Sequence, residues 1–260
     1  MKLLLIILLI LLIVYLIIFK KSKEMFVNNN TEILESILNN TYFINMDINK
    51  FRLNYLTKQL KDNGIKINRF KAYSGKNLNR IELINNNYLT KINILKDGQL
   101  GCAYSHCKLL EKIQNENIKY ALILEDDVII PKNFKKQIKN ILNYLPNEWD
   151  LLYLGGCNIK GKLINKYFIK PTINNNLYNL CAHAYIINKK SINKILKIIK
   201  PMTIPIDNQL RDNFKNINVY FVNPNIIIQN KDIISTRRVL DGKKQSIFWK
   251  NNQQNISIIK

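Results

Sequence analysis

Short apolar runs and longer amphipathic segments alternate along the chain from residue 41 onward. Apolar runs of strand length occupy residues 41–46, 65–73, 121–124, 150–154, 181–187 and 219–222. Between them, apolar residues recur every three or four positions, which predicts helices over 50–63, 98–115, 134–145 and 191–199. Strands that alternate with helices predict an open, largely parallel α/β sheet with helices on both faces. Such a sheet binds its ligands beyond the carboxyl ends of its strands.

A different pattern begins the chain, where Leu3 to Phe19 is an unbroken apolar run of 17 residues. Lysines flank it and no small-residue cleavage site follows, so we expect an uncleaved transmembrane anchor within residues 1–20. The sequence then predicts a polar stalk over 21–40, one folded domain over 41–238 and a basic tail over 239–260. The lysine balance favours a cytosolic domain, whereas three Asn-x-Ser/Thr sequons fit a lumenal one. The side of the membrane therefore stays open.

The overall charge is strongly positive, with 40 basic and 18 acidic residues and a formal net charge of +22. A charge of this size would suit a polyanionic partner such as nucleic acid or anionic lipid. The lysines are dispersed, however, and Asn and Ile are over-used alongside them, which AT-rich codon usage would explain. We therefore do not expect nucleic-acid binding.

The four cysteines, Cys102, Cys107, Cys157 and Cys181, include no C-x-x-C pair and no zinc-finger spacing with His106. This pattern predicts small, buried apolar thiols. Two disulfides are the alternative if the domain lies in an oxidising compartment.

Three adjacent acids interrupt an otherwise apolar stretch at residues 120–131. Glu125, Asp126 and Asp127 follow the buried run 121–124 directly, and apolar residues resume after them. Like charges repel unless a cation or water screens them. At the carboxyl end of a buried strand, these carboxylates form a candidate oxygen-ligand site for Mg²⁺ or Mn²⁺. A solvated acidic turn is the alternative. The sequence contains no GxGxxG or P-loop motif that would indicate another mode of nucleotide binding.

Eight short motifs occur in order between about residue 41 and residue 238. They are YFINMD (42–47) with Arg52, FKAYSG (70–75), GCAYSH (101–106), LILEDD (122–127), WDLLYLG (149–155), HAYII (183–187), PID (205–207) and IISTR (233–237). This ordered set resembles glycosyltransferase family 25, which includes bacterial lipopolysaccharide galactosyltransferases and collagen hydroxylysine galactosyltransferases. The resemblance implies a GT-A-type, Rossmann-like fold and a divalent metal, with Mn²⁺ expected. It also implies inverting transfer of a sugar, with UDP-galactose as the expected donor. The acceptor would be a hydroxyl of a glycan, a lipid-linked sugar or a protein hydroxylysine.

The resemblance places the acidic triplet where GT-A enzymes carry an Asp-x-Asp motif, although the first acid here is Glu. Asp127 is then the expected metal ligand. Glu125 is expected to bind either the metal or the donor's ribose, and Asp126 the ribose or the groups around it. His183 is a candidate to complete the metal shell, with a buried core histidine as the alternative.

Other residues in the matching motifs are expected near the sugar nucleotide. They are Asn45, Asp47, Arg52, Gly75, Ser105, His106 and Arg237. Structural roles compete with several of these assignments, because Asp47 could cap a helix, Gly75 could serve a tight turn and His106 could be a hydrogen-bonded core residue.

An inverting transfer needs a general base to take the proton of the acceptor hydroxyl. Asp207 is the first candidate, and Asp150 is the second. Each has a structural alternative, because Asp207 precedes a short helix that it could cap and Asp150 could simply begin a strand.

Two other classes of function also use clustered carboxylates. A metal-dependent phosphotransferase or nuclease would need separate acidic motifs for a second metal, which the sequence does not obviously provide. A non-catalytic glycosyltransferase-like binding protein would not need the intact acidic triplet.

Overall fold

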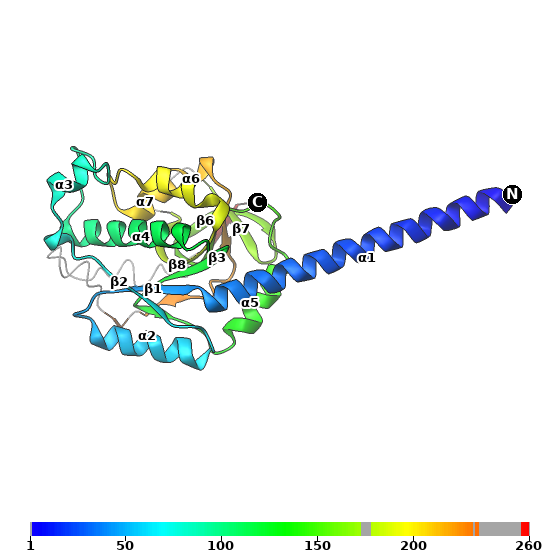
Figure 1. Ribbon diagram of the computed structural model, residues 1–260, viewed down its shortest axis with the longest axis horizontal. Helices are drawn as coiled ribbons and strands as arrows, with labels where there is room; N and C mark the ends of the chain where they lie inside the picture. The colour runs from blue at the N-terminus through cyan, green and yellow to red at the C-terminus, as the bar shows by residue number, and fades with distance from the viewer. Residues whose placement is uncertain (1, 173–177, 231, 234–255, 260) are drawn as a thin grey trace.

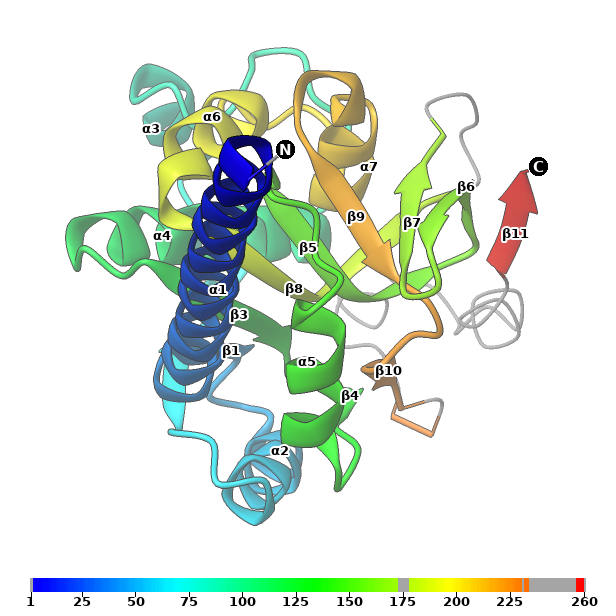
Figure 2. The same ribbon diagram turned by 90° about the vertical axis from the view of Figure 1, so that its right-hand side faces the viewer.

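The computed structural model describes residues 2–172, 178–230, 232–233 and 256–259. Nine strands form one sheet in the order β11-β6-β7-β9-β5-β8-β3-β1-β2, and a short two-stranded sheet of β4 and β10 accompanies it. Helices lie on both faces of the large sheet (Figure 1, Figure 2). The open α/β architecture expected from the sequence is therefore confirmed.

The first three strands form a parallel unit at one side of the sheet. β1 (Thr41–Asn45) lies between β2 (Asn68–Lys71) and β3 (Tyr120–Glu125) and runs parallel to both. Every residue of β1 is buried, and in β3 only Glu125 is partly exposed. Such continuous burial is typical of strands that are covered on both faces. Because the three strands run in one direction, their carboxyl ends meet at one edge of the sheet.

The rest of the sheet is mixed rather than parallel. β8 (Leu180–Asn188) runs antiparallel between β3 and β5 (Leu151–Cys157), and β9 (Val219–Val222) is parallel to β5. β3 and β5 therefore point the same way, and β8 begins at the edge where they end.

A hairpin of β6 (Ile159–Asn165) and β7 (Phe168–Pro171) extends the sheet, and β11 (Ile256–Ile259) pairs with β6. The apolar pattern did not predict these strands. Lysine, glycine and asparagine interrupt the alternation in β6, where several side chains are exposed.

Two sets of helices enclose the sheet, and each set buries an apolar core against one face. One face carries α4 (Asp97–Asn115), α6 (Lys189–Ile199) and α7 (Ile206–Arg211), with α3 (Arg80–Asn85) at its end (Figure 1). The other face carries α2 (Lys50–Asp62) and α5 (Phe134–Leu142). The remaining short elements are η1 (Gly75–Asn77), η2 (Phe214–Asn216), β4 (Val128–Ile129) and β10 (Ile228–Gln229).

The amino-terminal helix, α1 (Lys2–Asn39), joins this second face by its last turns. Ile33 and Ile37, one turn apart, are 2% and 0% exposed in the same apolar core as α2 and α5. The Ser36 hydroxyl also donates to the Tyr120 carbonyl at 2.8 Å. The structure thus differs from the predicted stalk over 21–40, because the end of that segment is part of the folded domain.

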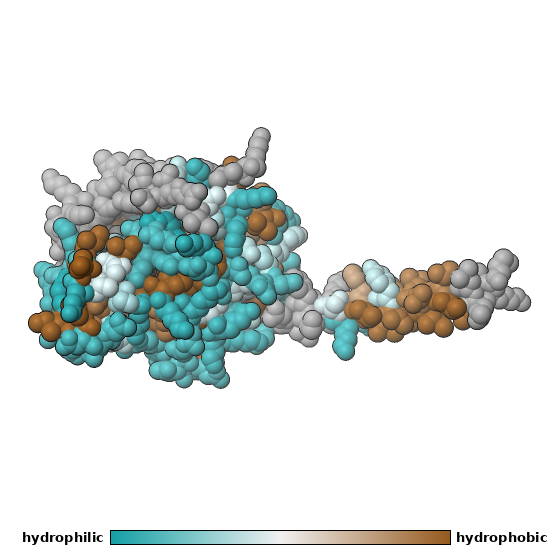
Figure 3. All heavy atoms as spheres, turned by 90° about the horizontal axis from the view of Figure 1, so that it is seen from above, coloured by the Kyte–Doolittle hydropathy of each residue, from teal (hydrophilic) through white to brown (hydrophobic). Residues whose placement is uncertain are grey.

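The expected membrane anchor over residues 3–19 is not supported. Within the part of the chain that is described, no helix combines the length and the apolar character that crossing a membrane requires. The side chains from Ile6 to Phe19 are exposed, and they form the largely apolar stretch of the projecting helix in Figure 3. Most of the predicted basic tail, residues 239–255 and 260, lies outside the described residues.

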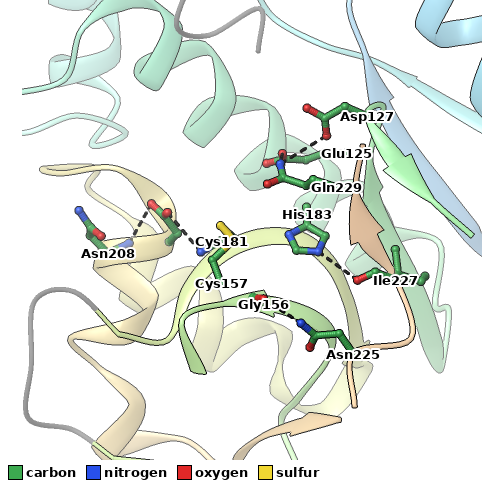
Figure 4. Close-up of a disulfide and its surroundings, with 11 residues drawn as sticks. Glu125, Asp127, Gly156, Cys157, Cys181, His183, Asn208, Asn225, Ile227 and Gln229 are labelled. Atoms are coloured by element: carbon green, nitrogen blue, oxygen red, sulfur yellow. Dashed lines mark hydrogen bonds between the residues drawn. A yellow bond between two sulfur atoms is a disulfide. The ribbon is translucent and has the colours of Figure 1, made fainter. Parts of the chain in front are cut away.

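The structure corrects the cysteine prediction for two of the four residues. Cys157 at the end of β5 and Cys181 at the start of β8 form a disulfide (Figure 4). Cys102 and Cys107 on α4 are not in a disulfide, as expected. The spacing along the sequence could not reveal the pair, because it depends on the antiparallel placement of β8 beside β5.

Candidate active site

The acidic triplet lies at the carboxyl edge of the parallel strands, as predicted. Glu125 is the last residue of β3, and Asp126 and Asp127 form the turn into β4. β1 ends beside it, since Ile44 is the register partner of Glu125. The three acids do not share one set of hydrogen-bond partners, although they are adjacent in the sequence.

Asp126 is held in a buried ion pair on the side of β1 and α2. Its two carboxylate oxygens accept from Arg52 Nη1 and from Asn45 Nδ2, both at 2.6 Å. Burial raises the pKa of Asp126 although the guanidinium favours its ionised form. With both oxygens engaged, Asp126 fixes α2 against the turn. We therefore assign it a structural contact rather than a direct contact with the donor.

Glu125 and Asp127 share a different partner on the opposite side. The side-chain amide of Gln229 lies 3.4 Å from Glu125 Oε2 and 3.4 Å from Asp127 Oδ1 (Figure 4). Gln229 reaches this position because β10 pairs antiparallel with β4, with Gln229 opposite Val128. Burial and the charge of Glu125 raise the pKa of Asp127 to about 7.

This arrangement fits a divalent cation. Two carboxylates that converge on one amide offer the hard oxygen ligands that Mg²⁺ and Mn²⁺ prefer. Glu125 and Asp127 are therefore the residues that would hold the expected metal, and Asp126 is not.

A cavity with a volume of about 1130 Å³ lies beside the turn, beyond the carboxyl ends of β1 and β2. Its lining includes Asp47, Arg52, Lys71, Tyr73 and Asn77. Arg52 also pairs with Asp126, so this one side chain connects the cavity to the acidic turn. A concave site of this size, with an aromatic ring and a few polar groups, suits a small organic ligand such as a nucleoside.

Asp47 does not cap α2, because the cap position is Asn49 and no side chain bonds there. Its carboxylate instead pairs with Arg69 at 2.6 Å and Lys71 at 2.7 Å. Hydrogen bonds from Lys71 and Arg69 lower the pKa of Asp47 to about 2. Arg69 also donates to Asn45 Oδ1 at 3.0 Å, so a polar network joins β1 and β2 at the cavity.

Gly75 and Ser105 have packing roles behind the cavity wall. A Cβ atom on Gly75 would lie 1.8 Å from the Asp97 carbonyl oxygen, so only glycine allows α4 to approach this closely. The buried Ser105 hydroxyl donates to the Gly101 carbonyl at 2.6 Å and accepts from the Tyr73 amide at 2.9 Å. These contacts hold the loop that carries the cavity residues. The predicted contact of Gly75 and Ser105 with the sugar nucleotide stays a prediction.

Both histidines lie close to Glu125 of the acidic turn. His106 on α4 is buried, with Nε2 at 3.7 Å from Glu125 Oε1 and Nδ1 at 2.9 Å from the Tyr185 hydroxyl. His183 on β8 is also buried, and its Nε2 lies 3.3 Å from the Ile227 carbonyl oxygen. Burial lowers the pKa of His183, which keeps its imidazole neutral as a metal ligand or a core residue requires. Figure 4 shows His183 close to Gln229 and Glu125.

The two candidate bases lie at opposite edges of the sheet. Asp207 at the start of α7 accepts from the backbone amides of Cys181 at 3.4 Å and Asn208 at 3.0 Å. Cys181 belongs to the beginning of β8, which is the edge where β3 ends. Asp207 is thus brought toward the acidic turn. It does not cap α7, because the cap position is Pro205 and no side chain bonds there.

Asp150 precedes β5 and therefore lies at the far edge of the sheet. Its carboxylate accepts from the Ser191 hydroxyl, from Lys194 Nζ at 3.0 Å and from the Asn218 amide at 2.8 Å. Although burial opposes ionisation, these bonds hold the pKa of Asp150 below its usual range. The structure does not support Asp150 as the base, because it joins β5, α6 and β9 a full strand length from Glu125.

The sequence interpretation missed three residues of the site: Gln229, Tyr185 and Arg69. Gln229 follows an apolar run, and nothing in its local sequence indicates that β10 pairs next to the acidic turn. Tyr185 and Arg69 lie in strands, where their burial and register decide which neighbours they meet. Arg237, predicted to contact the diphosphate, lies outside the described residues.

Comparisons with known proteins identify the family of this chain. The model of glycosyltransferase family 25, described as an LPS biosynthesis protein, matches residues 38–210. A Haemophilus influenzae protein named as a glycosyltransferase is 26% identical over 147 residues, which cover 52% of this chain and 50% of that protein. Procollagen galactosyltransferase 2 of Homo sapiens is 24% identical over 169 residues, 60% of this chain and 27% of that protein. The chain thus spans half or less of the length of these relatives.

A solved structure of a glycosyltransferase involved in the glycosylation of the major capsid of PBCV-1 aligns with 78% of this chain and 96% of its own. The TM-score is 0.44 and the sequence identity is 8%. The family match covers β1, the acidic turn, the helix that carries His106 and the strand that carries His183. Because the family model matches residues 38–210, the chain belongs to glycosyltransferase family 25.

Proposed function

We propose that this chain transfers a hexose, with galactose expected, from a UDP-sugar to an acceptor hydroxyl with inversion, on a GT-A-type fold. The observation that carries the proposal is the convergence of Glu125 and Asp127 beside a cavity at the carboxyl edge of the sheet. Open α/β sheets bind nucleotides in this position.

The cavity would receive the uridine of the donor. Tyr73 offers an aromatic face there, and the polar groups of Asp47 and Asn77 offer hydrogen bonds. The Lys71 side chain, 74% exposed, brings a positive charge to the same site. The diphosphate would extend from this cavity toward the acidic turn, past Arg52.

Glu125 and Asp127 would hold the divalent cation, for which we propose Mn²⁺. A bound cation neutralises the diphosphate and stabilises UDP as a leaving group. The two carboxylates supply negative charge in a buried turn, so the affinity for a dication comes from this pair of residues.

Asp207 is our proposed general base. The acceptor hydroxyl would give its proton to the carboxylate as its oxygen attacks the anomeric carbon, and the bond from that carbon to UDP breaks on the opposite face. The backbone amides of Cys181 in β8 and Asn208 in α7 donate to the Asp207 carboxylate and fix its orientation.

The names of the family and its relatives indicate which acceptors to compare. The family description names LPS biosynthesis and one relative is named for procollagen. A glycan, a lipid-linked sugar and a protein hydroxylysine are therefore the acceptors to compare.

The test is donor hydrolysis and transfer with UDP-galactose, UDP-glucose and UDP-GlcNAc, each with Mn²⁺ and with chelator. We expect turnover of UDP-galactose that depends on Mn²⁺ and falls about a hundredfold or more in Asp127→Asn. The control is Asp212→Asn, because Asp212 is an exposed acid that pairs with its neighbour Arg211. Full activity in Asp127→Asn would refute the metal role. Hydrolysis of none of the three donors by folded protein would favour a non-catalytic or phosphotransferase function.

A further inference from the structure

The Glu125 carboxylate has a second set of neighbours that the proposed reaction does not use. Its Oε2 faces Gln229, whereas its Oε1 lies 3.7 Å from His106 Nε2 and 3.9 Å from Cys102 Sγ. Cys102 and His106 are four residues apart on α4, so they project from the same face of that helix. One carboxylate therefore stands between two groups of potential metal ligands.

The spacing of the second group is that of a tetrahedral metal site. Zinc holds imidazole and carboxylate ligands at about 2.0–2.2 Å and thiolate at about 2.3 Å, which sets neighbouring ligand atoms roughly 3.3–3.8 Å apart. The two measured distances to Glu125 Oε1 fall at or close to this range. All three ligand atoms lie within 4.8 Å of one another. A small adjustment of side chains would therefore bring them onto one ion.

His106 provides an independent indication. Its side chain is only 1% exposed, and its Nε2 atom has no hydrogen-bond partner among the described residues. At 3.7 Å, the approach to Glu125 is too long to be a hydrogen bond. The other ring nitrogen lies 2.9 Å from the Tyr185 hydroxyl, and burial keeps the pKa of that phenol well above its usual value. A metal-ligating imidazole commonly has such an outer partner, which fixes its orientation.

We propose that Cys102, His106 and Oε1 of Glu125 form a second metal site, selective for Zn²⁺, with water as the fourth ligand. A thiolate and an imidazole favour zinc over Mn²⁺, whereas Asp127 and Oε2 of Glu125 offer only oxygen. Binding displaces the thiol proton of Cys102, because zinc is held by the thiolate.

A shared carboxylate makes zinc an inhibitor. With zinc on Oε1, the charge of Glu125 is partly neutralised and a second dication lies close by, so the Glu125–Asp127 pair binds Mn²⁺ more weakly. This inhibition rests on the proposed function. The binding of zinc does not, and it is measured separately.

The binding test uses the full chain, freed of metal with a chelator and titrated with Co²⁺ and then Zn²⁺ without added thiol. We expect a thiolate-to-cobalt charge-transfer band, its loss when zinc displaces cobalt, and release of one proton per zinc. Cys102→Ser should abolish the band, and His106→Gln should weaken zinc binding about tenfold or more. Cys107→Ala is the matched control on the same helix and should behave as the unmodified chain.

Three results would overturn the proposal. They are the absence of a charge-transfer band, its persistence in Cys102→Ser, and its loss in Cys181→Ser. The last result would place the metal at His183 and at the thiolates of Cys157 and Cys181, released from their disulfide, because these ligand atoms also lie together. Circular dichroism shows whether each variant is folded. If Cys102→Ser does not fold, His106→Gln provides the test.

The inhibition test measures Mn²⁺-dependent donor hydrolysis at increasing zinc. Zinc should raise the Mn²⁺ concentration for half-maximal rate about tenfold or more, and Cys102→Ser should remove that shift. Zinc binding without inhibition would contradict the shared carboxylate but leave the metal site standing. A chain that binds zinc but hydrolyses no donor would refute the proposed function alone.

Discussion

At the scale of single residues, the acidic triplet separates into two kinds of carboxylate. Asp126 is balanced by Arg52 and Asn45 at 2.6 Å, whereas Asp127 is buried beside Glu125 with the Arg52 guanidinium at 3.6 Å and the Gln229 amide at 3.4 Å. A carboxylate that is buried without full compensation costs stability, and such sites are where cations bind. We therefore expect stability and function to depend on different members of the triplet.

Replacing Asp126 should destabilise the fold, and replacing Asp127 should not. Asp126→Ala removes the closer of the two carboxylates that pair with the buried Arg52 guanidinium, so we expect a loss of about 3–5 kcal/mol in the free energy of unfolding. Asp127→Asn removes a repelled charge and should leave that free energy unchanged or increase it. Urea denaturation in chelator measures both. Equal losses in the two variants would contradict this division.

The stability of the metal-free protein should also depend on pH through Asp127. Burial and Glu125 raise its folded pKa to about 7, whereas an unfolded Asp titrates near about 3.9. The folded state thus binds this proton more tightly. Its contribution is full below about pH 4 and is lost as the pH rises toward 7. Unfolding in chelator should show a decline over this window that is smaller in Asp127→Asn. Identical pH profiles would show that Asp127 is ionised throughout.

At the scale of secondary-structure elements, the direction of β8 decides what the site contains. Because β8 runs antiparallel to β3, its first residues come to the edge where β3 ends, together with His183 and the Asp207 contact at Cys181. The same topology leaves Asp150 at the opposite edge, where it joins three elements.

The two candidate bases should therefore respond differently to substitution. Asp150→Ala removes the acceptor for Ser191, Lys194 and the Asn218 amide, so we expect a loss of about 2–3 kcal/mol in unfolding free energy with unchanged kcat per folded molecule. Asp207→Asn should lower kcat about a hundredfold or more while KM for the donor stays the same. Steady-state kinetics with a transferable acceptor, together with denaturation, separates these effects. Full turnover in Asp207→Asn would place the base elsewhere.

At the scale of the whole molecule, the folded domain begins within α1 rather than after it. The helix passes from exposed apolar side chains at residues 6–19 to buried ones at Ile33 and Ile37, which pack with α5 and β3. The boundary expected at residue 41 follows the change in composition, but the core extends one to two helical turns further toward the amino terminus.

This boundary predicts a contrast between two isoleucines of one helix. Ile37→Ala should lower the free energy of unfolding by about 2–5 kcal/mol, because it leaves a cavity in the core. Ile10→Ala is the matched control, since the Ile10 side chain is 53% exposed and its loss should have little effect. Denaturation of the full chain tests both, and equal effects would contradict the packing of α1 against the domain.

The sequence alone determined the α/β class, most helix and strand positions, and the placement of the acidic triplet after a buried strand. These features depend on local periodicity and on the order of segments, which the chain carries within windows of a few residues. The family resemblance rested on the same local motifs.

Only the tertiary structure decided which residues meet. It paired Cys157 with Cys181, brought Gln229 to Glu125 and Asp127, tied Asp126 to Arg52 and sent Asp150 to the far edge. The physical reason is that these contacts join segments from about 24 to more than 100 residues apart. Their geometry depends on strand direction and register. A strand that ran in the opposite direction would place the residues at its two ends at the opposite edges of the sheet.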